Sequence, residues 1–119
     1  MGGSGEGDAN VILYGVGSCD TCRKAAKELA AQGISVTRVD VRAEPLSADQ
    51  IFRFLDAFGD ALINRKSTTW RGLSDAERAT APAELLAAHP ALMKRPVISG
   101  PGGLTLGWGP DAQAAHLGS

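Results

Sequence analysis

The stretch that most constrains the fold is residues 11–33, VILYGVGSCDTCRKAAKELAAQG. Its first four residues form a short apolar run that two glycines follow, which predicts a buried strand and a tight turn. Residues 25–30 place small and apolar side chains at helical spacing, and Gly33 is typical of the residue just after a helix. The stretch therefore predicts a strand, a turn and a helix in direct succession.

Cys19 and Cys22 lie between this strand and this helix, and they are the only cysteines in the chain. A thiol at the first turn of a helix faces unpaired backbone N–H groups and the positive end of the helix dipole, and both favour the thiolate. Cys22 lies three residues after Cys19, so the two sulfurs can share one helix face and close a small disulfide. We therefore predict a site for thiol redox chemistry.

Three other roles for these cysteines need weighing. A zinc site is disfavoured, because there is no second pair of cysteines and the two histidines, His89 and His116, lie far away at no recognisable spacing. We expect no metal, and we expect the histidines at the surface. A permanent structural disulfide is typical of secreted proteins, and the start of the chain lacks the features of a signal peptide. Two buried, unreactive cysteines are the remaining alternative.

Length and charge narrow the possibilities further. A chain of 119 residues is long enough for one domain with a modest core, and a net charge of −1 gives no reason to expect nucleic acid or an anionic membrane as a partner. No apolar run is long enough to span a membrane. We expect a flexible tail at residues 1–10, a single domain at residues 11–119, and a cytoplasmic location.

The order of the later segments predicts an α/β fold. We expect strands at about residues 11–15, 34–41, 97–99 and 104–106, the first two parallel and the last two a hairpin with a four-to-five-residue connection. Between the second and third strands lies a helical insertion. This order is that of a thioredoxin-like fold with a mixed four-stranded sheet. Pro96 then begins the third strand, where such folds hold a cis-proline facing the cysteines.

The helical insertion carries clear start signals. Ser47 with Gln50 and Ser74 with Glu77 each match a capping box, and Pro82 suits the start of a further helix. An apolar stripe follows the first of these boxes at helical spacing, and we interpret it as core packing.

Four blocks, in this order, resemble the ArsC/Spx/YffB family, and most closely its YffB-like branch. They are Tyr14-Gly15 with residues 18–25 (SCDTCRKA), residues 62–65 (LINR) with residues 68–71 (TTWR), residues 94–96 (KRP), and residues 106–108 (LGW). The resemblance runs from about Val11 to the end of the chain. Members of the family include glutaredoxin-coupled arsenate reductases.

The resemblance implies roles for particular residues. In the arsenate reductases of this family, the first cysteine attacks arsenate and three arginines bind the oxyanion, so Cys19 matches the nucleophile and Arg65 and Arg95 match two of the arginines. Arg65, Arg95 and Pro96 are thereby expected to bind substrate. The third arginine should fall near Gly109, and this chain has none there, which counts against arsenate because guanidinium groups bind and neutralise such an anion.

The expected function is that of a cytoplasmic thiol-disulfide oxidoreductase. Cys19 attacks a disulfide or an oxidised substrate, Arg95 helps to stabilise its thiolate, and Cys22 or an external thiol resolves the intermediate. The resemblance implies glutathione or glutaredoxin as reductant, or a protein disulfide as partner, with no bound cofactor. One alternative is a true glutaredoxin-coupled arsenate reductase. The other is an Spx-like regulator without enzymatic activity, which binds RNA polymerase and uses the two cysteines as a redox sensor.

Overall fold

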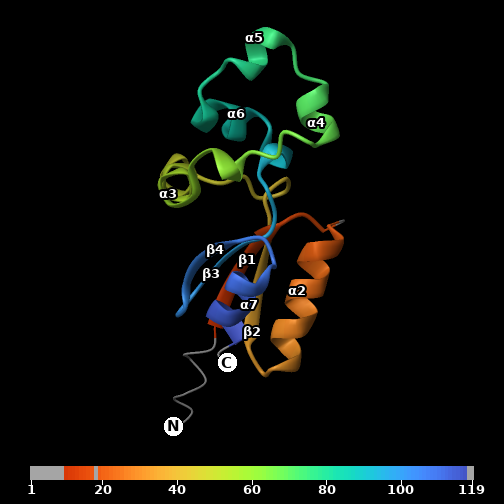
Figure 1. Cartoon of the computed structure of the whole chain (residues 1–119), viewed down its shortest axis with the longest axis vertical. Coiled ribbons are helices and arrows are strands. Elements are labelled where there is room, and N and C mark those ends of the chain that lie inside the picture. The colour runs from red at the N-terminus through yellow and green to blue at the C-terminus, as the bar shows by residue number, and fades with distance from the viewer. Residues whose placement is uncertain (1–9, 18, 118–119) are drawn as a thin grey trace. The chain divides into compact units, whose positions relative to one another are not determined.

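The computed structural model describes residues 10–17 and 19–117, and it contains one four-stranded sheet (Figure 1). Its strands are β1 (Asn10–Gly15), β2 (Ser35–Asp40), β3 (Val97–Gly100) and β4 (Gly103–Leu106). The spatial order is β2-β1-β3-β4, so the strand before the cysteines lies inside the sheet.

The strand directions make the sheet mixed. β1 and β2 are parallel, whereas β3 is antiparallel to both β1 and β4. The predicted fold class, strand order and directions are therefore confirmed. β-Branched residues are enriched in strands because they pack well on a pleated surface, which is why these segments could be identified in the sequence. The ends differ slightly: β1 begins one residue earlier than predicted, and β2 is one residue shorter at each end.

The prediction of a four-to-five-residue hairpin connection is wrong. Gly100 pairs with Gly103, so the turn consists of Pro101 and Gly102 alone. Gly103 has a φ of +110°, a conformation that favours glycine. A Cβ atom on Gly102 would lie 1.9 Å from the carbonyl oxygen of Ala115. The tight turn and its close packing against the last helix therefore require these glycines.

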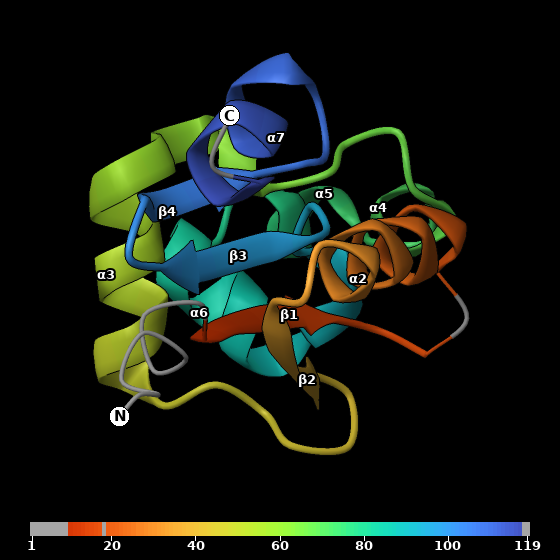
Figure 2. The ribbon, with the colours of Figure 1, turned by 90° about the horizontal axis from the view of Figure 1, so that it is seen from below.

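Two helices, α2 (Asp20–Ala31) and α7 (Pro110–Leu117), pack against the same face of the sheet (Figure 2). The buried residues between them form one apolar cluster: Val11, Leu13, Cys22, Ala25, Leu29, Ile98, Trp108 and Ala112. Because Cys22 belongs to this cluster, its position is determined by the core rather than by a mobile loop.

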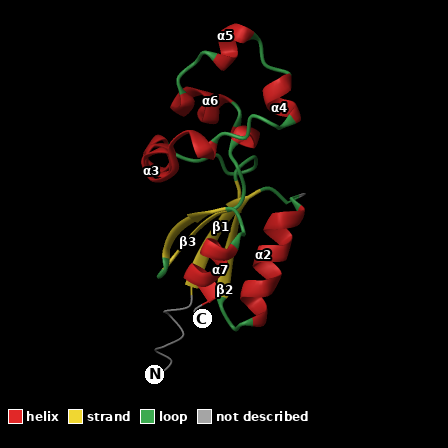
Figure 3. Ribbon diagram, in the orientation of Figure 1, coloured by secondary structure: helices red, strands yellow, loops and turns green. Residues whose placement is uncertain are grey.

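The helices between β2 and β3 form a second compact unit, Val41–Lys94, which we call the helical unit. Its elements are short (Figure 3): α3 (Ala48–Phe58), α4 (Thr68–Arg71), α5 (Asp75–Arg78), α6 (Pro82–Ala88) and two 3-10 helices, Gly59–Leu62 and Pro90–Leu92. Both predicted capping boxes are present, at the starts of α3 and α5. Buried side chains such as Phe54 and Leu85 supply its core.

The rest of the chain, up to Asp40 and from Arg95 onward, is the other compact unit, which we call the sheet unit. The predicted tail falls almost wholly on residues 1–9, which lie outside the described residues. The single-domain boundary at residues 11–119 stays a prediction. No helix of the described residues is long and apolar enough to cross a membrane.

Candidate active site

Cys19 is the N-cap residue of α2. Its backbone is extended, with φ −79° and ψ 116°, and its Sγ accepts a hydrogen bond from the backbone N–H of Cys22 over 3.3 Å. The backbone N–H of Cys19 donates to the carbonyl oxygen of Val16, which fixes the turn that precedes the helix. The sulfur thus occupies the place where side-chain oxygens normally satisfy the first N–H groups of a helix.

The surroundings of Cys19 favour its thiolate. Partial burial acts to raise the pKa of this thiol, but hydrogen bonds from the thiol and backbone of Cys22 lower it, and the charge of Arg95 and the backbone of Thr21 lower it further. The pKa of Cys19 is therefore below its ordinary value. Cys19 is also partly exposed, so a reagent can reach it.

Cys22 has the opposite properties. Burial, the hydrogen bond to Cys19 and the charge on Cys19 raise the pKa of the Cys22 thiol to about 12. The residue is completely buried, whereas Cys19 is not. Both cysteines are free thiols in this structure. Cys19 is therefore the more readily ionised of the two thiols, and Cys22 donates a hydrogen bond to it.

Gly15 provides the space that Cys22 occupies. A Cβ atom on Gly15 would lie 2.4 Å from Sγ of Cys22, far inside van der Waals contact. Its φ is not in the left-handed region, so the requirement for glycine here is the close approach of the sulfur.

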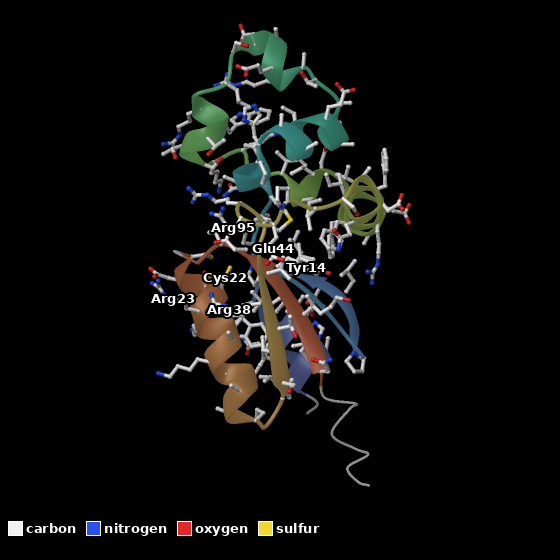
Figure 4. All side chains as sticks on the ribbon, turned by 180° about the vertical axis from the view of Figure 1, so that it is seen from behind. Tyr14, Cys22, Arg23, Arg38, Glu44 and Arg95 are labelled. Atoms are coloured by element: carbon white, nitrogen blue, oxygen red, sulfur yellow. The ribbon has the colours of Figure 1, made fainter. Side chains whose placement is uncertain are left out.

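Arg95 and Pro96 stand at the start of β3, in the same unit as the cysteines. Figure 4 shows Arg95 beyond the N-terminal end of α2, close to Cys22, and its charge lowers the pKa of both thiols. The Arg95–Pro96 peptide bond is cis, as predicted. The carbonyl oxygen of Pro96 accepts the backbone N–H of Gly107 over 2.7 Å, which ties β3 to the end of β4.

Two side chains hold the turn before Cys19, and sequence reasoning missed both interactions. Oδ2 of Asp40, at the end of β2, accepts the backbone N–H of Gly17 over 3.2 Å. Arg23 of α2 donates to the carbonyl oxygen of Gly17 and forms an ion pair with Asp20 on the outer side of the helix. A polar residue that ends the neighbouring parallel strand was the available signal for Asp40. Ser18, which the family motif includes, lies outside the described residues.

Arg65 belongs to the helical unit, so its predicted role near Cys19 stays a prediction. Its guanidinium lies 3.5 Å from a carboxyl oxygen of Asp60 and 5.3 Å from the ring centroid of Trp70. Arg78 approaches the same ring at 5.6 Å. These contacts give Arg65 a defined place on its own unit.

In the region where the resemblance requires a third arginine, hydrogen bonds hold Trp108 in place. Its indole N–H donates to a carboxyl oxygen of Glu28 on α2 over 3.2 Å, and Gln113 of α7 donates to its carbonyl oxygen. The next residue, Gly109, is exposed, and a Cβ atom there would meet nothing within 4 Å. The site therefore has room for a side chain that the sequence does not supply.

The prediction that both histidines lie at the surface is wrong for His116. Only 6% of this residue is exposed, because α7 turns Ala112 and His116, four residues apart, toward the sheet. Nε2 of His116 lies 2.8 Å from the hydroxyl of Thr105. Over the described residues, no three histidine, cysteine or acidic side chains are grouped as a metal site would need.

Comparison with known proteins places this geometry in a family. The model of the ArsC family matches residues 14–115, which include both cysteines, Arg95 and Pro96. The chain belongs to the ArsC family. The predicted family is therefore confirmed.

Individual similarities agree with this membership. A solved structure of a protein named YffB is 33% identical, covers 90% of this chain and 98% of its own, and has a TM-score of 0.82. An arsenate reductase (ArsC) related protein from Brucella melitensis is 37% identical, covers 90% of this chain and 93% of its own, and has a TM-score of 0.69. The global transcriptional regulator Spx of Listeria innocua is 32% identical over 107 residues, which are 85% of this chain and 82% of that protein.

Proposed function

We propose that this ArsC-family chain is a thiol-dependent oxidoreductase in which Cys19 is the nucleophile. The observation that carries the proposal is the placement of two neighbouring thiols: Cys19 is partly exposed and its Sγ caps α2 by accepting the Cys22 N–H, whereas Cys22 is fully buried. In agreement with this placement, the pKa of Cys19 is lowered and that of Cys22 is raised to about 12. The thiolate is the attacking form of cysteine, so the two thiols are suited to successive steps.

In the first step, the Cys19 thiolate attacks one sulfur of a substrate disulfide, and the other sulfur leaves as a thiolate. In the second step, Cys22 attacks Cys19 and releases the first sulfur, which leaves a Cys19–Cys22 disulfide that the external thiol reduces; alternatively, an external thiol attacks the first sulfur and releases the Cys19 thiolate. We propose glutathione or glutaredoxin as the external reductant, and a small or protein disulfide as substrate. Exchange among thiols needs no bound cofactor, and we propose that the reaction takes place in the cytoplasm, where thiols are kept reduced.

Arg95 has two parts in this proposal. Its charge lowers the pKa of Cys19, and its guanidinium can hold a carboxylate or oxyanion of the substrate beside that sulfur. Pro96, the residue after Arg95, is proposed to contact the same substrate. Arg65 is proposed as a second anion-binding group because it matches the family motif.

Arsenate reduction is the second candidate, and the similarity to the Brucella ArsC-related protein favours it. In that reaction Cys19 attacks arsenate, and glutathione and glutaredoxin regenerate the enzyme. The absence of an arginine near Gly109 opposes it, since one of three anion-binding groups is missing.

A regulatory role is the third candidate, because the Spx protein of Listeria innocua is 32% identical to this chain. In that case Cys19 and Cys22 are a redox sensor, and the partner is RNA polymerase. The regulator would use the same two thiols as the oxidoreductase, but their oxidation would change binding to the partner and would not convert a substrate.

A coupled assay separates these candidates. The purified protein is mixed with hydroxyethyl disulfide, glutathione, glutathione reductase and NADPH, and in parallel with arsenate, glutathione, glutaredoxin and the same coupling enzyme. We expect turnover of the disulfide that Cys19→Ser abolishes, and little turnover of arsenate. Turnover of arsenate alone would favour the second candidate. Reversible oxidation of the two cysteines without turnover of either substrate would favour the regulator.

A further inference from the structure

The resolving step raises a chemical difficulty at Cys22. To attack Cys19, the Cys22 thiol must lose its proton, but it is fully buried against Gly15 and the apolar cluster. In the reduced protein, burial, the hydrogen bond to Cys19 and the charge on Cys19 raise the pKa of this thiol to about 12, and the burial remains when Cys19 is in the mixed disulfide. A direct attack by Cys22 at neutral pH therefore needs a nearby group that accepts this proton.

The cations around the thiols cannot accept a proton, so the candidate must be a carboxylate. Asp20 stands at the outer side of α2, with 90% of its side chain exposed, and is paired with Arg23. Glu28 is two turns further along α2 and accepts the indole N–H of Trp108. Asp40 differs from both, because it comes from the neighbouring strand and reaches the turn before Cys19.

Asp40, at the end of β2, lies beside the residue of β1 against which the Cys22 thiol packs. It is the direct partner of Gly15 in the parallel pairing of β1 and β2, and paired strands are about 4.8 Å apart. A Cβ atom on Gly15 would point at Sγ of Cys22 from 2.4 Å. Directly paired residues present their side chains on one face, so the side chain of Asp40 lies on the same face of the sheet as Cys22, at the strand position next to a residue that has no side chain.

A cavity of about 220 Å³ adjoins this point. Gly15, Gly17, Arg38 and Asp40 line it, together with apolar side chains of β1 and β2. A water molecule takes up about 30 Å³ in the liquid, so the cavity is large enough for several. Water in this cavity can therefore contact both the Asp40 carboxyl and Gly15, the residue against which Sγ of Cys22 packs.

We propose that Asp40 is the proton acceptor of the resolving step, acting on the Cys22 thiol directly or through water in this cavity. This inference rests on the dithiol mechanism under Proposed function. The Cys22 proton passes to the Asp40 carboxylate, and the Cys22 thiolate attacks Sγ of Cys19 in the mixed disulfide. The bond between Cys19 and the substrate sulfur breaks, and that sulfur leaves with the electron pair and takes a proton from Asp40 or from water. Cys19 and Cys22 are oxidised to a disulfide, and the substrate disulfide is reduced to two thiols.

The aromatic disulfide DTNB tests each step separately, because it releases one coloured thiolate when Cys19 attacks it and a second when Cys22 resolves the mixed disulfide. The variants are Asp40→Asn, which can still accept the Gly17 N–H, and Asp40→Glu, which restores a carboxylate. Asp56→Asn, the same change on an exposed part of α3, is the matched control. The other charged groups near this region are Arg38 of the cavity wall, Arg23, which donates to the Gly17 carbonyl, and Arg95, and all of them stay in place.

We expect Asp40→Asn to release the first thiolate at the wild-type rate and the second at least about tenfold more slowly near pH 7.5. The difference between the second-release rates of Asp40→Asn and wild type should shrink as pH rises toward the pKa of Cys22, because hydroxide then takes the proton of Cys22. Asp40→Glu should recover part of the rate, and Asp56→Asn should behave as wild type.

Three results would overturn the inference, and they are distinguishable. A second release from Asp40→Asn within about twofold of wild type at every pH would exclude Asp40 as proton acceptor while leaving the dithiol mechanism intact. Release of only one thiolate by the wild-type protein would show that Cys22 does not resolve the intermediate, and the proposed dithiol mechanism would fail with it. A constant deficit at all pH values would mean that Asp40 only positions the turn.

Discussion

The backbone N–H of Cys22 donates to Sγ of Cys19 over 3.3 Å, so the sulfur of one cysteine caps the helix that carries the other. This contact favours a charged Cys19, whereas burial and the thiol–thiol hydrogen bond favour a neutral Cys22, so the two thiols are suited to unequal roles. Arg95 adds a positive charge to the same place.

The first prediction concerns Arg95. Removing its charge with Arg95→Ala should raise the pKa of Cys19, whereas Arg95→Lys should leave it nearly unchanged, since a point charge is enough to stabilise the thiolate. The rate of alkylation by iodoacetamide as a function of pH measures this pKa. Arg71→Ala, which removes an exposed arginine of the helical unit, is the control.

The same variants also separate thiolate stabilisation from anion binding. If Arg95 holds the substrate through two of its N–H donors at once, Arg95→Lys should lose roughly tenfold or more in anion-dependent turnover, because a charge-assisted hydrogen bond is worth about 1.5–3 kcal/mol. Equal turnover in Arg95→Lys and wild type would limit Arg95 to its effect on the thiol.

The second prediction concerns Gly109. Because a Cβ atom there meets nothing within 4 Å and its φ is not positive, an arginine side chain should be accepted without strain. We expect little arsenate reduction by wild type and an increase in Gly109→Arg. Gly109→Lys adds the charge without the planar guanidinium and should gain less. Rapid arsenate turnover by wild type would show that two arginines are enough.

The third prediction concerns Gly15. The clash of a new Cβ atom with Cys22 should make Gly15→Ala less stable by about 1–3 kcal/mol, measured as the free energy of unfolding in urea. In a Cys22→Ala background the sulfur is gone, so the same change should cost clearly less. An equal loss in both backgrounds would mean that something other than the sulfur fills this space.

The fourth prediction concerns His116 and the pH dependence of stability. Burial lowers the pKa of His116 in the folded chain, whereas a histidine in the unfolded chain has a pKa of about 6.5. As pH falls below that value, the unfolded chain binds a proton that the folded chain does not, so the free energy of unfolding should fall until the folded pKa is passed.

The test of the His116 prediction compares urea midpoints at pH 7.5 and at lower pH. His116→Gln should flatten the pH dependence. His89→Gln, which changes a partly exposed histidine 3.8 Å from Glu77, should leave the contribution of His116 in place. If wild type and His116→Gln respond equally to pH, the burial of His116 has no such consequence.

The fold was predictable because its signals are local. The β-branched residues of β2, the capping boxes at Ser47 and Ser74, and the cysteine spacing each depend on neighbours in sequence. Asp40 could not be assigned, because its contact with Gly17 spans 23 residues and exists only once β1 and β2 pair in register. His116 was misjudged since α7 has no apolar stripe to indicate which side faces the sheet.

The central claim is that Cys19 and Cys22 form a working dithiol, and intact mass after controlled oxidation tests it most directly. The reduced protein is equilibrated in a buffer at a potential that oxidises glutaredoxin, and a thiol-alkylating reagent is then added. We predict a protein lighter by two hydrogens that takes up no alkyl group, with Cys19→Ser or Cys22→Ser as the control that cannot form this bond. A protein that takes up two alkyl groups under these conditions would contradict the account and leave Cys22 without a part in the chemistry.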